Sequence, residues 1–210
     1  RFSWRMISEN SNISQSAYQI KVYKLSNLAE KQLIWDSGKV ISDKSVQVQY
    51  EGPQLQSREQ YCYIVRVWCS NGEVSDWSHE CRWEMGLLHT EDWVAQWIEP
   101  EQEDVTEEPE LTLEDMFINK KKGVTIPPEK RLHPAKYVRK SFRVEEKQIT
   151  QARLYITAHG LYQARLNGKK VTEAEFTPDY TSYNHYLQYQ TYNVLPFLQR
   201  GENVFGVVLA

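Results

Sequence analysis

The sequence has no run of about 18 apolar residues, the length that a membrane-spanning helix requires. It also has no excess of basic residues, because 25 lysines and arginines stand against 28 aspartates and glutamates, for a formal net charge of -3. The cation-rich surface that nucleic-acid-binding proteins use is therefore not expected. We predict neither a nucleic-acid partner nor a membrane partner.

Cysteine is scarce, with three residues in 210. Cys62 and Cys69 fall on one predicted strand at positions that point to opposite faces, so they cannot bridge each other. A hairpin turn centred on Asn71 and Gly72 would place Cys62 opposite Cys81. That pair either forms a disulfide or stays as two buried thiols in a reducing compartment.

Histidine shows no pattern typical of a metal centre. The five histidines have no metal-ligand spacing with one another or with cysteine. We therefore expect no metal site built from soft ligands, and no cofactor follows from the pattern. The chain also opens without an initiator Met or a basic-plus-apolar leader, which leads us to expect a segment of a longer protein and leaves its compartment open.

Alternating apolar and polar residues with regularly spaced turns dominate residues 1–86, which predicts a small antiparallel β-sandwich. The hydrophobic fraction of 40% is sufficient for real cores. The expected strands are Arg1 to Met6, Ser16 to Leu25, Leu33 to Val40, Ser45 to Leu55, and the two arms around Asn71-Gly72.

The arms around Asn71-Gly72 carry Trp68, Trp77 and Trp83. Arg66 shares a strand face with Trp68, so it is placed to stack on aromatic rings and stiffen the sheet surface. The alternative is a flat aromatic platform for a sugar ring. Strands of this kind commonly carry aromatic residues for packing, which favours the stiffening role.

Residues 87–134 interrupt the strand pattern. Thr90 stands where the N-cap of a short helical turn is expected, and a strand that would open the second domain should follow around Trp97. The stretch from Glu101 to Pro134 is acidic first and basic second, which predicts an insertion loop or linker with a short helix near Leu111 to Ile118. The Lys120–Lys122 run fits a solvated loop better than a binding patch.

Residues 135–210 return to strand patterns and predict a second β-sandwich. Asn167-Gly168 predicts a hairpin turn with positive φ angles. The final apolar stretch, Gly206 to Ala210, should lie in the middle of a sheet, and we expect it to need a partner that this chain does not supply. Such an uncovered strand would favour association in solution.

Several of these segments together resemble the N-terminal region of bacterial α-L-rhamnosidases. The match is carried in order by RFSWRM, SAYQIKV, WDSGKV, EMGLL followed by DW and QWI, YVRKSFRV, ARLYITAHGLYQARLNGKKV, YQTYNV and GENVFGVVL. The resemblance implies an all-β chain: an Ig or fibronectin type III-like sandwich over 1–86 and, after the connector, a jelly-roll-like sandwich over 135–210, incomplete at its C-terminus.

The same resemblance implies a division of labour. These rhamnosidases are inverting glycosidases, in which one carboxylic acid protonates the leaving oxygen and one carboxylate activates water. In the family both acids lie in a helical barrel that follows the β-domains. The resemblance therefore implies no catalytic residue here, a downstream catalytic domain of the same polypeptide as partner, and rhamnose-containing glycans as ligands.

A carbohydrate site in the second sandwich is a further implication, because in some family members the corresponding domain binds rhamnose with calcium. Carboxylate and amide oxygens are hard ligands that suit calcium, so calcium is the one cofactor that the resemblance implies. For Asn167 the alternative is turn formation, and for the tyrosines it is packing. The chain departs from the family at Asp179-Tyr180, where a Gly-Trp pair is common. The candidates are Tyr162, Asn167, Asp179, Tyr180 and Tyr183, with Tyr186 beside them.

Three functions remain open on the sequence. The first is the accessory, non-catalytic β-region of an α-L-rhamnosidase. The second is a carbohydrate-binding module for rhamnose. The third is a structural fibronectin-type interaction protein with no role in sugar binding.

Overall fold

The computed structural model describes residues 1–26, 30–101, 112–119, 134–145 and 148–210, and the chain divides into two compact units, 1–95 and 96–210. Both are built of antiparallel strands, as the all-β prediction requires. No helix in the described ranges is long and apolar enough to cross a membrane. The predicted boundaries at residues 86 and 134 stay predictions.

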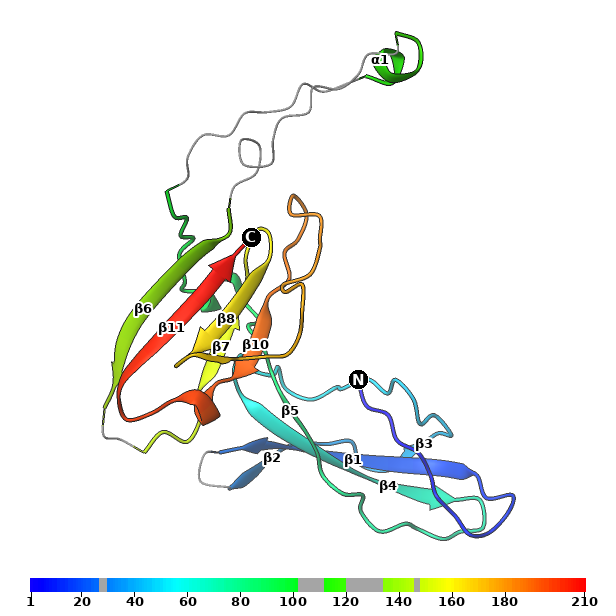
Figure 1. Cartoon of the computed structure of the whole chain (residues 1–210). Helices are drawn as coiled ribbons and strands as arrows, with labels where there is room; N and C mark the ends of the chain where they lie inside the picture. The colour runs from blue at the N-terminus through cyan, green and yellow to red at the C-terminus, as the bar shows by residue number, and fades with distance from the viewer. Residues whose placement is uncertain (27–29, 102–111, 120–133, 146–147) are drawn as a thin grey trace. The chain divides into compact units, whose positions relative to one another are not determined.

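The first unit is an immunoglobulin-like sandwich built on one sheet with the order β2-β1-β4-β5, to which β3 adds by pairing with β1. Figure 1 shows β1 and β4 as long neighbouring strands, and their register runs from Gln15 opposite Cys69 to Leu25 opposite Gln60. The bounds are β1 Gln15–Leu25, β2 Lys31–Asp36, β3 Val40–Ile41, β4 Gln60–Cys69 and β5 Cys81–Glu84.

The second layer of this sandwich is irregular. The predicted strands Arg1 to Met6 and Ser45 to Leu55 are wrong as strands, because they are joined by an isolated bridge between Phe2 and Val48 and a hydrogen bond from Trp4 N to Ser45 O, not by a continuous ladder. Gln47 adopts a left-handed φ of 56°, which breaks the extended backbone at that point. The two segments still close the core, since Phe2 and Val48 are buried with inward residues of β1 and β4: Tyr18, Ile20, Val22, Val65 and Val67.

The chain between β4 and β5 does not form the regular hairpin that was predicted. Serine side chains take the place of ladder partners: Ser75 Oγ accepts from Val67 N at 3.0 Å, and Ser78 Oγ accepts from Val65 N at 3.0 Å. When β5 begins, Cys62 lies opposite Arg82, so the predicted opposition of Cys62 and Cys81 is wrong by one residue.

That one-residue offset turns the two cysteines to opposite faces of the sheet. Cys62 is buried, Cys81 is exposed, and all three cysteines are free thiols. Of the two alternatives, the disulfide is therefore not formed, while the expectation of two buried thiols holds only for Cys62.

The connector contains two short helices among its described residues. A 3-10 turn, η1, spans Thr90–Asp92, with His89 rather than Thr90 at the N-cap, which corrects the predicted cap. The predicted helix is confirmed as α1, Leu113–Phe117. The strand expected around Trp97 is wrong, because no strand is formed over 93–101. The Lys120–Lys122 run lies outside the described residues.

The second unit pairs a four-stranded sheet, β6-β11-β8-β9, with a two-stranded sheet, β10-β7. Figure 1 shows β6, β11 and β8 side by side. A short 3-10 turn, η2 at Leu195–Phe197, precedes β11. The bounds are β6 Lys136–Val144, β7 Arg153–Ile156, β8 Tyr162–Leu166, β9 Lys169–Lys170, β10 Gln190–Asn193 and β11 Gly201–Leu209.

The expectation that the last strand lacks a partner is wrong. β11 pairs with β6 on one side, from Gly201 opposite Val144 to Leu209 opposite Lys136, and with β8 on the other. Ala210 continues the ladder, since its N–H donates to Leu161 O at 2.9 Å and its C=O accepts from Leu161 N at 2.7 Å. The strand does lie in the middle of its sheet, and Val207 is buried in the core with Tyr162, Ala164 and Leu166 of β8.

Candidate functional site

The predicted carbohydrate candidates lie on β8, on the turn after it and on the loop between β9 and β10. That loop is tied to the sheet at Thr177, whose C=O accepts from Tyr162 N at 2.8 Å and whose Oγ1 donates to Tyr162 O at 2.7 Å. Gln190 Nε2 donates to Pro178 O at 2.8 Å on the other side. These bonds fix the point on the sheet from which the loop segment with Asp179, Tyr180 and Tyr183 extends.

Tyr162 lies in the core of the second unit. Its hydroxyl donates to Gln190 Oε1 at 2.9 Å and lies 3.2 Å from the Tyr192 hydroxyl, and only 5% of the residue is exposed. Burial raises the pKa of the Tyr162 phenol, and the neighbouring Tyr192 adds to the effect. The burial of its ring supports packing, rather than sugar stacking, as the role of Tyr162.

Asn167 forms the turn between β8 and β9, as the sequence predicts. Its φ of 52° and the φ of 81° at Gly168 are both left-handed. Its side chain is fully engaged: Nδ2 donates to Phe197 O at 2.9 Å and to Asn203 Oδ1 at 2.8 Å, while Oδ1 accepts from Val204 N at 2.9 Å. The geometry supports turn formation, the alternative to ligation.

Asn203 is a buried polar residue that the sequence analysis missed. It is 0% exposed and joins the start of β11 to the β8-β9 turn: Nδ2 donates to Gln199 O and Gly201 O, and Oδ1 accepts from Gln199 N and Asn167 Nδ2. The only local signal is its place directly after Gly201-Glu202 at the start of β11, which an exposed asparagine could occupy equally well.

Asp179 lies on the exposed part of the loop with a φ of 85°. Its Oδ1 accepts from Tyr180 N at 2.7 Å, a local bond typical of aspartate in turns. Within the described ranges, no group of three or more His, Cys, Asp or Glu residues is arranged to hold a metal ion. Calcium binding by this loop stays a prediction.

The exposed tyrosines belong to a row of aromatic rings, the aromatic row, formed by Trp97, His159, Tyr183 and Tyr180. The ring centroids are 4.7 Å apart for Trp97 and His159, and 4.9 Å apart for His159 and Tyr183, whose planes differ by 6°. Tyr180 follows at 6.5 Å from Tyr183. The Tyr183 hydroxyl accepts from Gly160 N at 3.0 Å, which fixes its ring.

The aromatic row faces solvent along most of its length. Tyr180 is 88% exposed and Trp97 63%, and the nearby loop residues Phe176 and Tyr186 are 77% and 60% exposed. The sequence did not predict Trp97 and His159 as site residues, because they lie far apart in the chain and only the tertiary fold brings them together. Large exposed apolar groups gathered in this way are typical of an interaction surface.

In the first unit, cations lie over two of the tryptophans, Trp68 and Trp77, whereas Trp83 packs against the core and stacks on Tyr61. The Arg66 guanidinium lies 5.0 Å from the Trp68 ring centroid and 4.7 Å from that of Trp77. Lys39 lies 4.7 Å from Trp68, and Lys21 lies 5.1 Å from Trp77. The prediction that Arg66 stacks on aromatic rings is confirmed, and this alternation of cations and rings supports stiffening rather than a sugar platform.

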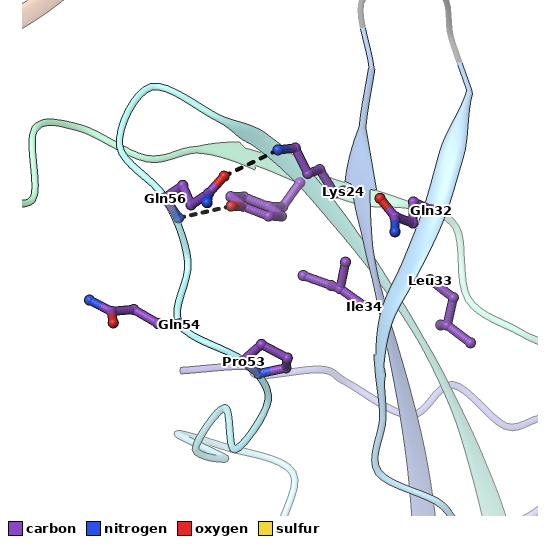
Figure 2. Close-up of a pocket in the computed structure, with 8 residues that line it drawn as sticks. Lys24, Gln32, Leu33, Ile34, Pro53, Gln54 and Gln56 are labelled. Atoms are coloured by element: carbon purple, nitrogen blue, oxygen red, sulfur yellow. Dashed lines mark hydrogen bonds between the residues drawn. The ribbon is translucent and has the colours of Figure 1, made fainter.

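The first unit also has a shallow groove of about 370 Å³, shown in Figure 2. Lys24 Nζ donates to Gln56 Oε1 at 3.3 Å, and Gln56 N donates to the Tyr61 hydroxyl at 2.9 Å. These bonds hold the segment before β4 against the sheet, and no predicted site residue lies there. The lining is Lys24, Gln32, Leu33, Ile34, Pro53, Gln54, Gln56 and Tyr61.

Two carboxyl groups of the first unit have a shifted pKa, and both are lowered. At Asp36 partial burial acts to raise the pKa, but hydrogen bonds from Gln19 and Gly38 and the charge of Lys21 outweigh it. At Asp92 a hydrogen bond from Ser57 lowers the pKa, with backbone N–H groups of His89 and Leu88 contributing. A glycosidase general acid requires the opposite shift, so neither group has that character.

Two family models match the chain. Residues 1–89 match the Rha78A-like N-terminal immunoglobulin domain, and residues 147–210 match the alpha-L-rhamnosidase N-terminal domain. The matched ranges correspond to the first sandwich and to most of the second.

Individual proteins give the same result over the whole chain. An alpha-L-rhamnosidase of Formosa agariphila is 34% identical over 100% of this chain, and one of Alteromonas sp. is 35% identical over 100%. The solved alpha-L-rhamnosidase from Dictyoglumus thermophilum superposes over 99% of the chain with a TM-score of 0.77 and 31% identity. The chain spans 21% of the length of the two curated relatives and 22% of the solved one. By these matches the chain corresponds to the N-terminal region of α-L-rhamnosidases, with the two β-domains that the family models describe as N-terminal.

Proposed function

We propose that this chain is the accessory, non-catalytic β-region of an α-L-rhamnosidase, and that the carboxyl groups that break the glycosidic bond belong to another part of the polypeptide. The observation that carries the proposal is the pair of coverages: essentially all of this chain aligns, but it accounts for 21% of each curated relative. An inverting reaction needs two facing carboxyl groups about 6.5 to 9.5 Å apart across a sugar site. The groove of the first unit is lined by amides, one lysine, one tyrosine and apolar groups, and no carboxyl group belongs to its lining.

The test compares residues 1–210 with a longer polypeptide that carries them. The longer protein should release the aglycone from a neutral aryl α-L-rhamnoside, whereas residues 1–210 alone should give no turnover above buffer. Turnover by the 210-residue chain would overturn this division of labour.

The partner of this region is, in the same proposal, the rest of the polypeptide, and the aromatic row is the surface that contacts it. Tyr180, at one end of the row, is too exposed to contribute to the core of the second unit. The variant Tyr180→Ser should leave the melting temperature of residues 1–210 unchanged but lower that of the longer polypeptide. If the substitution also left the melting temperature of the longer polypeptide unchanged, the aromatic row would not be part of that interface.

A second candidate is a carbohydrate-binding module, because the open face of Tyr180 suits the apolar side of a pyranose ring. It predicts saturable heat of binding with L-rhamnose, lost in Tyr180→Ala, and reduced by a chelator if calcium takes part through Asp179. Phe117→Ala, on an exposed aromatic residue of α1 outside the row, is the matched control. A flat calorimetric trace with millimolar sugar would eliminate this candidate.

A further inference from the structure

The outward face of the four-stranded sheet in the second unit carries a line of cations. Along β6, Val138 and Phe142 pack against the core, so Tyr137, Arg139, Ser141 and Arg143 point the other way. The register places Arg139 opposite Gly206 of β11, Gly206 opposite Arg165 of β8, and Arg165 opposite Lys170 of β9. We define this cross-strand line, Arg139-Gly206-Arg165-Lys170, as the arginine row.

The arginine row is an unfavourable arrangement for a sheet that only has to fold. Like charges directly opposite each other on one face, as Arg165 and Lys170 are, destabilise a strand pair. Lys170 has one carboxylate nearby, with Nζ 3.3 Å from Glu175 Oε1. Arg139 and Arg165 have no carboxylate partner among the described residues. The charge of the row is therefore largely uncompensated.

Arg165 is held in place by neutral acceptors. Its Nε and Nη2 donate to Gln163 Oε1 at 3.2 and 3.0 Å, and its Nη1 donates to Gly168 O at 3.0 Å. A guanidinium group has five N–H donors, so donors remain for a ligand. Positioning by neutral partners keeps the full charge available and reduces the entropy lost when an anion binds.

Gly206 leaves an open space between the two arginines. Arg139 and Arg165 are two strands apart, a separation of about 10 Å across the sheet. Apart from Val138 O at 3.9 Å, nothing lies near the position of a Cβ at residue 206. On the next line of the same face, Tyr137 lies opposite Val208 and is 81% exposed. An elongated ligand could lie over the glycine with an anionic group at each arginine and an apolar ring face against Tyr137.

We propose that the arginine row binds an anionic polysaccharide through its carboxylate or sulfate groups. Arginine forms bidentate, charge-assisted hydrogen bonds with planar carboxylates and with sulfur or phosphorus oxyanions, which suits both kinds of group. The choice of a glycan among polyanions rests on the proposed function, because a glycan-hydrolysing enzyme meets such chains as it works. The row is separate from the aromatic row, and the two can be tested independently.

The experiment titrates residues 1–210 with an oligogalacturonide for carboxylate, dextran sulfate for sulfate, neutral dextran as blank and duplex DNA as an unrelated polyanion. At least one of the two anionic glycans should bind, the neutral dextran should not, and salt should weaken the binding. The arm that binds identifies the anionic group. Binding of neither glycan, or binding of DNA as tightly as the better glycan, would overturn the proposal.

A double variant and a matched control test whether binding takes place on this face of the sheet. The double variant Arg139→Gln, Arg165→Gln should weaken binding at least about tenfold, as expected for loss of charge-assisted hydrogen bonds. Lys140→Gln is the matched control, because it removes a positive charge from an exposed neighbour of Arg139 that belongs to the opposite face of β6. It should change the affinity less than twofold. An equal loss in the control and in the double variant would overturn the assignment to this face.

Gly206→Val tests whether the ligand lies in the space over residue 206, without changing any charge. Valine fits a strand, and its Cβ meets only ordinary contacts, so the melting temperature should not fall. Its side chain would occupy the space between the arginines and should weaken binding several-fold. Unchanged affinity would contradict the proposal that the ligand lies over residue 206. Hydrolysis of a neutral aryl rhamnoside by the longer polypeptide tests the proposed function separately, since these variants should leave it unchanged.

Discussion

Arg66 illustrates what a single residue contributes to this molecule. Its Nε and Nη2 donate to Gln19 Oε1 at 2.9 and 2.7 Å, and Gln19 Nε2 donates to Asp36 Oδ1 at 2.6 Å. The same guanidinium stacks between two tryptophans. Gln19 is 8% exposed, so its amide depends on Arg66 and Asp36 for its hydrogen bonds.

Arg66→Met should therefore lower the free energy of unfolding by about 2 to 4 kcal/mol, since it removes two cation–π contacts and leaves a largely buried acceptor unsatisfied. Urea denaturation followed by tryptophan fluorescence measures the change. Arg82→Met is the matched control, because Arg82 makes an exposed ion pair with Glu80 and its loss should cost less than about 1 kcal/mol. Equal effects of the two substitutions would show that Arg66 is only a surface charge.

At the scale of elements, the two Asn-Gly pairs behave differently although their sequence signal is the same. Asn167-Gly168 forms the tight turn, with Leu166 opposite Lys169. At Asn71-Gly72 only Gly72 is left-handed, and Asn71 Oδ1 accepts from Glu73 N at 3.1 Å in a local turn. The flanking residues cause the difference, because Ser75 and Ser78 offer side-chain acceptors to β4 where a regular strand would offer carbonyl groups.

Glycine substitutions in the β8-β9 turn and in β11 should have opposite effects. Gly168→Ala should destabilise the chain by about 1 kcal/mol, because Gly168 has a φ of +81° and an alanine there is strained even though its Cβ has room. Gly206→Ala should be neutral or stabilise by about 0.5 kcal/mol, since an ordinary strand conformation loses less entropy on folding with alanine. Thermal denaturation of both variants measures the difference, and a more stable Gly168→Ala would contradict the assigned turn.

At the scale of the whole molecule, acid stability depends on Asp36. Its pKa lies below the ordinary 3.8, so the group contributes stability above the pKa of the unfolded chain and loses that contribution as the pH falls through the folded value. Asp36→Asn should thus be less stable than the parent at pH 6, and the difference should shrink as the pH falls below about 4. Unfolding free energies between pH 2 and 6 test this, and a difference that stays constant with pH would exclude an ionic role.

The sequence by itself determined the all-β class, most of the strands, the turn at Asn167 and the family resemblance. Each of these rests on period-two alternation, on turn chemistry or on ordered motifs, which are local properties of the chain. The proposed division between accessory and catalytic parts rests on that resemblance and on the share of the relatives' length that the chain spans.

Only the tertiary structure decided which residues face one another across the sheets. A one-residue register offset separates Cys62 from Cys81, and β11 has a neighbour on each side because β6 and β8 both reach it. The aromatic row joins Trp97 and His159 to the tyrosines, and the arginine row aligns four strands. Alternation fixes the face on which a side chain lies, but its cross-strand neighbours depend on long-range register, which local sequence does not encode.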